Sequence, residues 1–214
     1  MTITYKELKR LIRFKSRDNN EIRFSDYDIR EALNECIRYF NNSYALQNSD
    51  FLEKTIILDE EEINREVDNV NAERLETGEE LLSRYDFKNT GVELPDDYIV
   101  LQTIRPEGGT GFAHPTEAGR IPRYDEFRVT GNRLYLGCPV VTMTYKAAIP
   151  EVKNEDDVLE LPFIFKDSLA KITCMILENN PSTDVMMEAV NDAVAQIVPR
   201  RRYSNARIRM PFYA

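Results

Sequence analysis

The segment from Tyr124 to Leu177 constrains the fold most, because the spacing of its apolar residues changes from that of strands to that of a helix. Two short alternating runs flank the pair Gly131-Asn132, and Gly-Asn supplies the positive φ angles that a tight hairpin turn needs. A third run, Val140 to Tyr145, is rich in β-branched and aromatic residues. From Leu161 onward, after an acidic linker, apolar residues recur at helical spacing. The segment therefore predicts a β-meander followed by an apolar helix.

Amphipathic helices are predicted on both sides of this β-region. Residues 4–14 and 25–46 form the first pair, and Ser25 with Asp28 resembles a capping box in which Asp replaces the usual Glu. Residues 161–179 and 182–198 form the second pair, an antiparallel helical hairpin. Neither pair has enough apolar face to stand alone, so we expect the two pairs to pack together. The stripes expected to meet are Ile29, Leu33 and Ile37 on one side, and Leu169, Ile172 and Ile176 on the other.

The middle of the chain is polar and acidic. Residues 51–58 fit either a strand or a connector, and residues 59–85 have a sparse helical pattern that Thr77-Gly78 should break in two. Between Asp59 and Glu80 there are ten acidic and two basic residues. We interpret this stretch as a solvated helix face and not as a metal site, because it lacks the alternating ligands and the central glycine of a calcium loop.

A long loop interrupts the predicted β-region. Residues 98–104 predict a strand, and residues 106–122 then contain four of the eight glycines and three prolines. We predict an α+β fold: a helical bundle from the N- and C-terminal helices, an inserted small antiparallel β-domain and an extended C-terminal arm. The predicted boundaries are residues 1–91 and 150–198 for the helical domain, 92–149 for the β-domain with its loop at 106–122, and 199–214 for the arm.

Catalytic motifs are not evident. The single histidine, His114, stands in the long loop without a nucleophile-elbow sequence, and one His with scattered Cys cannot complete a usual zinc site without carboxylates. Gly108, Gly109 and Gly111 suggest a phosphate-binding loop, but the Lys-Ser/Thr pair of a P-loop is missing. We therefore expect a protein that is not an enzyme and has no cofactor. A metal-dependent enzyme that uses carboxylates remains an alternative.

Cysteines and apolar runs indicate the compartment. Cys36, Cys138 and Cys174 stand far apart, each in or beside an apolar run, which favours buried thiols in a reducing compartment and no disulfides. No apolar run approaches the roughly 18 residues of a membrane span. The N-terminal residues lack the apolar stretch of a secretory signal. We expect no contact with a membrane.

The C-terminal arm carries only positive charge and ends in apolar residues. Its arginines could contact nucleic acid phosphates, or the arm could be a solvated tail. The apolar end favours a third interpretation, an arm that docks on an acidic partner protein, because Arg, Met and aromatic residues are enriched at interfaces. The residues proposed to bind are Arg200, Arg201, Arg202, Tyr203, Arg207, Arg209, Phe212 and Tyr213.

The order of these elements resembles the head-to-tail adaptor (connector) proteins of tailed bacteriophages, especially the tail-tubular group of short-tailed phages and its ring-protein relatives. Three places carry the resemblance: the run Leu94-Pro95-Asp96-Asp97-Tyr98, the Gly131-Asn132 hairpin, and Leu161-Pro162. It covers nearly the whole chain as a similarity of layout. The acidic stretch 59–80 has no counterpart in it.

The resemblance implies a structural protein of the virion, assembled in the host cytoplasm. Such adaptors form a homo-oligomeric ring, commonly a dodecamer, that joins the portal protein to the tail or the next ring protein and extends the DNA channel. The arm would then bind the portal, and the loop would bind the tail through Gly108, Gly109, Gly111, Phe112 and His114. DNA would pass without specific binding, because a net charge of −9 repels a duplex. The alternative is a soluble protein-binding module, regulatory or chaperone-like, that uses the loop or the arm.

Overall fold

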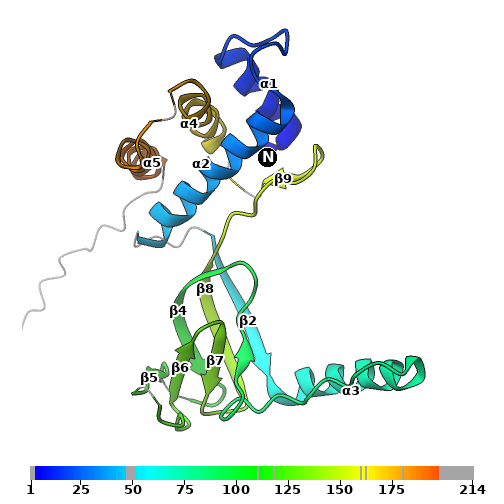
Figure 1. Ribbon diagram of the computed structural model, residues 1–214. Helices are drawn as coiled ribbons and strands as arrows, with labels where there is room; N and C mark the ends of the chain where they lie inside the picture. Colours follow the sequence, from blue (N-terminus) through cyan, green and yellow to red (C-terminus); the bar gives the residue numbers. More distant parts are fainter. Residues whose placement is uncertain are drawn as a thin grey trace, which may run out of the picture. The chain divides into compact units, whose positions relative to one another are not determined.

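The computed structural model describes residues 3–46, 52–109, 111–117, 119–159, 161, 163–179 and 181–197 (Figure 1). These residues have the predicted α+β fold. The chain divides into a first unit of residues 1–51 and 149–214 and a second unit of residues 52–148. The predicted boundary at residue 92 is therefore too late. Residues 52–91 belong to the second unit because β2 (Glu53–Asp59) pairs with β8 (Val140–Ala147) and Phe87 is buried in that unit's core.

Helices from both ends of the chain build the first unit. α2 packs against α4 and α5, and α1 packs against α4. In agreement with the expected packing of the apolar stripes, α2 and α4 pack together, and Ile29, Leu33 and Leu169 have no exposed surface. The Phe40 and Phe165 rings meet edge to face with centroids 6.0 Å apart. The bounds are α1 (Tyr5–Lys15), α2 (Asp26–Leu46), α4 (Phe165–Asn179) and α5 (Thr183–Ile197).

The predicted starts of α2 and α4 have different outcomes. The capping box before α2 is confirmed: the Ser25 N–H donates to the Asp28 carboxylate at 2.9 Å, and the Asp28 N–H donates to the Ser25 hydroxyl at 3.1 Å. α4 begins at Phe165, later than predicted. Leu161 instead donates its N–H to the Leu159 carbonyl oxygen at 2.7 Å, at the end of a short strand. That strand, β9 (Val158–Leu159), pairs with β1 (Ile3–Thr4).

Two sheets share the core of the second unit. One has the strand order β2-β8-β4, and the other has the order β3-β7-β6-β5. The predicted hairpin is confirmed: Thr130 pairs with Arg133, and Gly131 has a φ of 59°. A side chain at Gly137 would meet the Arg123 carbonyl oxygen at 1.4 Å, so only glycine fits there. The remaining strands are β3 (Val92–Glu93), β4 (Tyr98–Pro106), β5 (His114–Pro115), β6 (Glu126–Thr130) and β7 (Arg133–Leu136).

The prediction of a helix on each side of Thr77-Gly78 is wrong for its second half. α3 (Glu60–Thr77) is helical, and Gly78 ends it in the left-handed conformation with a φ of 74°. Residues 79–84 have no helical structure. Glycine adopts this conformation without the steric cost that other residues have, so the chain reverses direction there.

The long loop is more regular than predicted. His114 and Pro115 form β5, which pairs in parallel with β6. The Thr116 N–H donates to the Phe127 carbonyl oxygen at 2.8 Å, and Ala113 is buried in the core of the unit. Proline has no N–H, so Pro115 leaves no free donor on this edge strand.

The three cysteines are free and buried. Burial raises the pKa of Cys36 to about 12 and that of Cys174 to about 11. None of the helices in the described part of the chain combines the length and the apolar character needed to cross a membrane.

Candidate interaction surfaces

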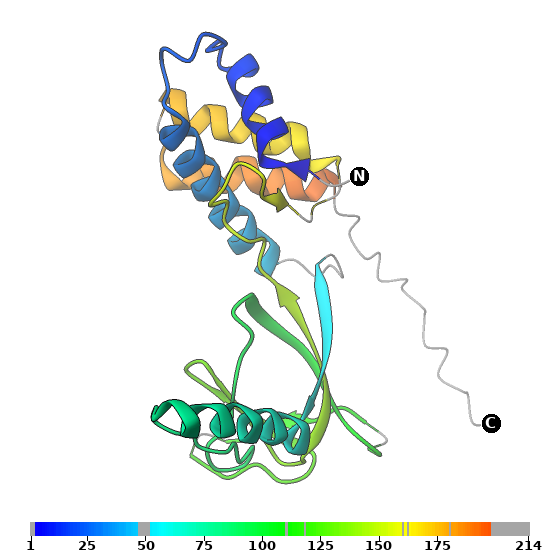
Figure 2. The same ribbon diagram turned by 90° about the vertical axis from the view of Figure 1, so that its right-hand side faces the viewer.

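The first candidate surface is a projection of the second unit, which we call the acidic spur (residues 60–85). It consists of α3 and a return segment, residues 79–85, that runs back along the helix (Figures 1 and 2). The first turn of α3 holds Glu60, Glu61 and Glu62, whose negative charges interact favourably with the positive end of the helix dipole. The Asp59 side chain caps α3 by accepting from the N–H groups of Glu61 and Glu62.

Two asparagines join the return segment to α3. The Asn64 amide donates to the Tyr85 carbonyl oxygen at 2.9 Å and accepts from the Tyr85 N–H at 2.7 Å. The Asn71 amide makes the same pair of bonds with Leu82, at 2.8 and 2.7 Å. Each side chain therefore binds backbone as a neighbouring strand would. We call this arrangement an asparagine zipper.

A zipper of the same kind occurs in the first unit. Asn34 binds the carbonyl and N–H groups of Val152 at 3.0 and 2.8 Å, and Asn41 binds those of Ile149 at 3.1 and 2.9 Å. In both zippers the asparagines are seven positions apart on the helix and their partners three positions apart on the extended segment. Seven helical residues rise about 10.5 Å, and three extended residues span about 10 Å. The two spacings match.

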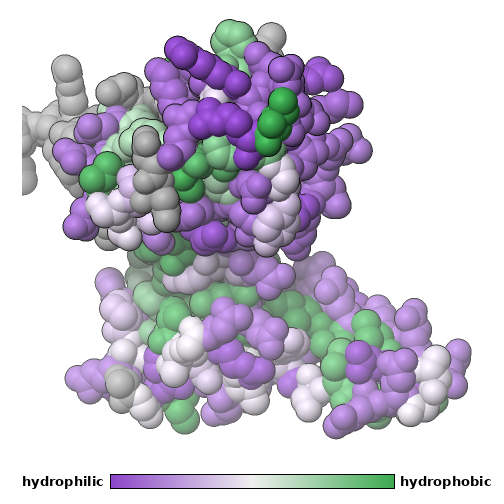
Figure 3. Space-filling model, turned by 45° about the horizontal axis from the view of Figure 1, so that its top comes forward, coloured by the Kyte–Doolittle hydropathy of each residue, from purple (hydrophilic) through white to green (hydrophobic). Residues whose placement is uncertain are grey.

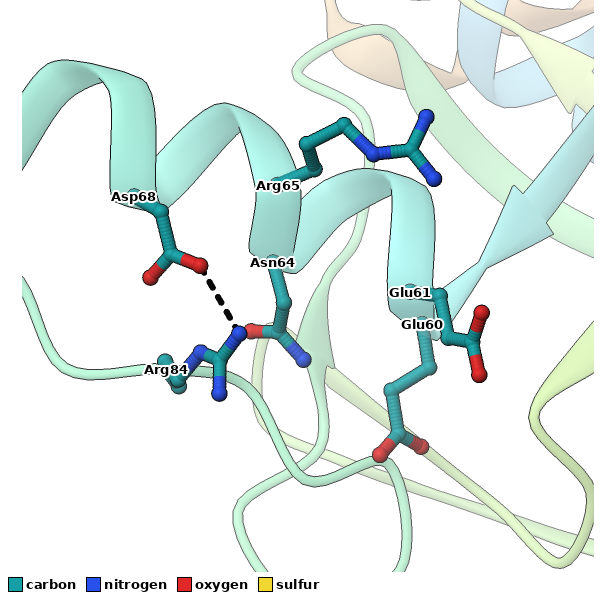
Figure 4. A pocket seen from close by; sticks show the side chains of 6 residues that line it. All are labelled: Glu60, Glu61, Asn64, Arg65, Asp68 and Arg84. Atoms are coloured by element: carbon teal, nitrogen blue, oxygen red, sulfur yellow. Dashed lines mark hydrogen bonds and ion pairs between the residues drawn. The ribbon is translucent and has the colours of Figure 1, made fainter.

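The spur is grooved and charged on its surface. An open groove of about 450 Å³ lies between the base of α3 and the return segment (Figure 4). Arg84 of the return segment reaches Asp68 of α3 at 2.8 Å, and Arg74 donates to the Glu80 carbonyl oxygen at 2.8 Å. Residues 60–85 hold nine acidic and three basic side chains, so the spur is strongly negative.

Apolar side chains on the spur are left uncovered. Leu75 is 72% exposed and Leu81 is 50% exposed. Figure 3 shows such apolar patches among hydrophilic side chains on the projection that α3 forms. Val67 is the one residue of α3 that is buried. Polar contacts therefore hold the return segment on α3, and Leu75 and Leu81 remain exposed.

The second candidate surface is the basic loop patch, which we define as Arg10, Phe14, Arg17 and Ile22. These residues belong to the last turns of α1 and to the loop that follows. Ile22 is 82% exposed and Phe14 is 69% exposed. Residues 10–23 hold five basic and two acidic side chains. The patch thus combines positive charge with exposed apolar groups.

A buried carboxylate fixes the loop that carries this patch. Asp18 is 2% exposed and accepts hydrogen bonds from the N–H groups of Ile22, Arg23 and Phe24, at 2.9, 2.9 and 3.1 Å. The Arg23 N–H foremost, with the other two, holds the pKa of Asp18 below its usual range. Arg13 also donates to Asp18, at 3.0 Å.

The same loop holds strained backbone. Arg17 and Glu21 have φ angles of 56° and 58°, in the left-handed region that residues other than glycine seldom adopt. Such conformations persist only where surrounding contacts determine them, and they concentrate at binding sites. The loop is therefore built to hold one shape.

The predicted tail-interaction residues belong to the second unit and follow β4 up to the start of β5. Gly108 and Gly111 are exposed, and the Gly109 N–H donates to the Pro106 carbonyl oxygen in the turn after β4. Phe112 is 51% exposed, and the Arg105 guanidinium lies over its ring, 5.1 Å from the ring centroid. His114 is exposed on β5. Phe112 thus lies against β4 of one sheet, and His114 lies on the edge strand β5 of the other.

The run Leu94-Pro95-Asp96-Asp97-Tyr98 anchors the start of β4. Asp97 accepts from Lys54 of β2 at 2.6 Å and from the Tyr145 hydroxyl of β8 at 2.9 Å. Burial opposes ionisation of Asp97, yet these two hydrogen bonds hold its pKa below the ordinary value. Burial, helped by Asp97, raises the pKa of Tyr145 to about 12. The network links three strands of one sheet.

The predicted arm residues Arg200, Arg201, Arg202, Tyr203, Arg207, Arg209, Phe212 and Tyr213 lie outside the described residues. Within the described ranges, no group of three or more His, Cys, Asp or Glu side chains is placed to hold a metal ion. Comparison with family models and with curated proteins finds no match to this chain.

Neither the acidic spur nor the basic loop patch was predicted from the sequence as an interaction surface. One signal was available for the spur: the seven-residue spacing of Asn64 and Asn71, which repeats that of Asn34 and Asn41. For the patch, Ile22 stands alone in a polar loop, and nothing local shows whether such a residue is buried.

Proposed function

We propose that this chain is a subunit of the ring that joins the portal to the tail in a tailed bacteriophage and extends its DNA channel. The proposal rests on the resemblance of its layout to the adaptor proteins, and the chain has two terminal pairs of helices in one unit and a β-rich unit between them. A net charge of −9 suits a conduit along which DNA slides without sticking. In this proposal the chain is structural and not an enzyme.

The observation that carries the proposal is the pair of surfaces that one subunit leaves uncovered. The acidic spur exposes leucines, and the basic loop patch exposes Phe14 and Ile22 on a fixed loop. Exposed apolar groups that share a patch with charged groups are typical of protein interfaces. A chain that bears two unlike surfaces is suited to head-to-tail contacts, which close into rings when the rotation between subunits permits.

The predicted partners fit the same proposal. The segment with Phe112 and His114 would face the tail or the next ring protein, and residues 199–214 would reach the portal protein. Assembly would take place in the host cytoplasm, and the assembled protein would be part of the virion.

Native mass spectrometry and negative-stain imaging test this proposal. The purified chain, alone and mixed with portal rings of the same phage, should form rings of many copies. A chain that remains a monomer or dimer under both conditions would contradict the proposal and favour a soluble protein-binding module. Capture of the portal without ring formation would also contradict it.

A further inference from the structure

We propose that the acidic spur of one subunit docks on the basic loop patch of the next subunit around the ring. The inference rests on the proposed function, because it specifies which surfaces form the lateral contact. The occupant of each surface is a second copy of this chain.

Charge complementarity is the first argument. The spur holds nine acidic and three basic side chains, and residues 10–23 hold five basic and two acidic ones. Asp18 and Arg13 are both buried and paired with each other, so neither faces a partner, and four basic side chains and one acidic one remain. Opposite potentials steer the encounter of two surfaces and suppress wrong partners.

The exposed apolar groups are the second argument. Leu75 and Leu81 on the spur are 72% and 50% exposed, and Phe14 and Ile22 on the patch are 69% and 82% exposed. Both sets are exposed, so each offers apolar surface that a contact with a second copy would bury. Burial of such apolar side chains contributes a favourable hydrophobic term to the free energy of association.

Rigidity on both sides is the third argument. The spur is held by the zipper of Asn64 and Asn71, and the patch loop by the Asp18 carboxylate. Surfaces that already hold their bound shape lose less conformational entropy on association. Arg17 and Glu21 of this loop have left-handed φ angles, which persist only where the surrounding contacts determine them.

Charge reversal with rescue tests the contact. The spur variant is Glu73→Arg with Glu76→Arg, and the patch variant is Arg10→Glu with Arg17→Glu. All four side chains are exposed, so the fold should be kept, which circular dichroism and thermal unfolding check. Each variant alone should associate at least about tenfold more weakly than the wild type, because like charges then meet.

Mixing the two variants should restore association, because a reversed spur then meets a reversed patch. The chain that carries all four substitutions should also assemble. A structural defect in either variant could not be repaired by mixing. Ile22→Ala should weaken association as well, whereas the control Ile164→Ala, also at an exposed isoleucine (61%), should not.

The outcomes separate the inference from the proposed function. Rings that form normally with every variant, alone or on portal rings, would overturn the spur-to-patch contact and leave the ring proposal standing. Loss of DNA retention by the patch variant, with rings intact, would overturn it in favour of a nucleic acid surface. A wild-type chain that forms no rings even on portals would overturn both.

Discussion

Replacement of Asn71 by alanine should release the return segment of the spur while the rest of the second unit stays folded. The Asn71 amide makes two hydrogen bonds with the backbone of Leu82, at 2.8 and 2.7 Å. A neutral hydrogen bond contributes about 0.5 to 1.5 kcal/mol net, so loss of both should lower the free energy of local opening by about 1 to 3 kcal/mol. Both partners are exposed to water, which satisfies the freed backbone groups and prevents a larger cost.

Amide hydrogen exchange, followed residue by residue by NMR, measures this local opening. The Leu82 amide should exchange about 5- to 150-fold faster in the variant, since 1.4 kcal/mol is a factor of ten. The Tyr85 amide should be less affected, because Asn64 still holds it. Phe87, which has no exposed surface, should keep its protection.

Asn69→Ala is the matched control, because Asn69 is exposed on the same helix. Both substitutions raise the helix propensity of α3 equally, so a difference between them reports the zipper bonds. Equal Leu82 exchange rates in the two variants would refute the reasoning. The return segment would then be held by contacts other than Asn71.

Four further predictions concern the rest of the chain. Asn34→Ala should unfold the first unit more easily by about 1 to 3 kcal/mol for each buried backbone group it leaves unpaired, and a chemical denaturation midpoint equal to that of wild type would contradict this. Ile37→Ala should cost about 2 to 5 kcal/mol in the same assay, because Ile37 has no exposed surface, and a cost below about 0.5 kcal/mol would argue against burial. The Arg13 hydrogen bond lowers the pKa of Asp26, so its stabilisation is complete above a pH of about 4 and is lost as the pH falls through the lower folded-state pKa, which NMR titration of the loop amides can follow. Deletion of residues 200–214 should leave a folded chain that no longer joins portal rings, and undiminished binding in a pull-down with portal rings would disprove the role of the arm.

Local signals predicted the parts of the fold that local interactions determine. Ser25 and Asp28 cap α2 reciprocally, and Gly131 makes the hairpin turn, because the residues that form each feature are neighbours in sequence. Periodicity likewise located α2 and α4, which pack together and bury Ile29 and Leu169.

Distant partners explain what the sequence did not predict. β2 could be a strand or a connector until its pairing with β8 is known, and that pairing moves residues 52–91 into the second unit. The sparse apolar residues of segment 79–85 fit a helical pattern. The partner that holds this segment extended is not a strand but the side chains of Asn64 and Asn71 on α3. The candidate surfaces were unpredictable for a related reason, since exposure of Ile22 depends on the Asp18 bonds that fix the loop.

The asparagine zipper explains why an exposed projection can hold its shape without a core of its own. A helix that leaves the body of a protein has no apolar layer to pack against, and isolated short helices are marginal in water. Four hydrogen bonds from Asn64 and Asn71 give the spur a second strand-like element without burying Leu75 or Leu81. In the first unit the same spacing ties residues 149–152 to α2 beside a buried core, where Asn34 is 5% exposed. The chain therefore uses one geometry for two purposes: in the first unit it adds to apolar packing, and in the spur it holds the return segment on α3 and leaves Leu75 and Leu81 exposed.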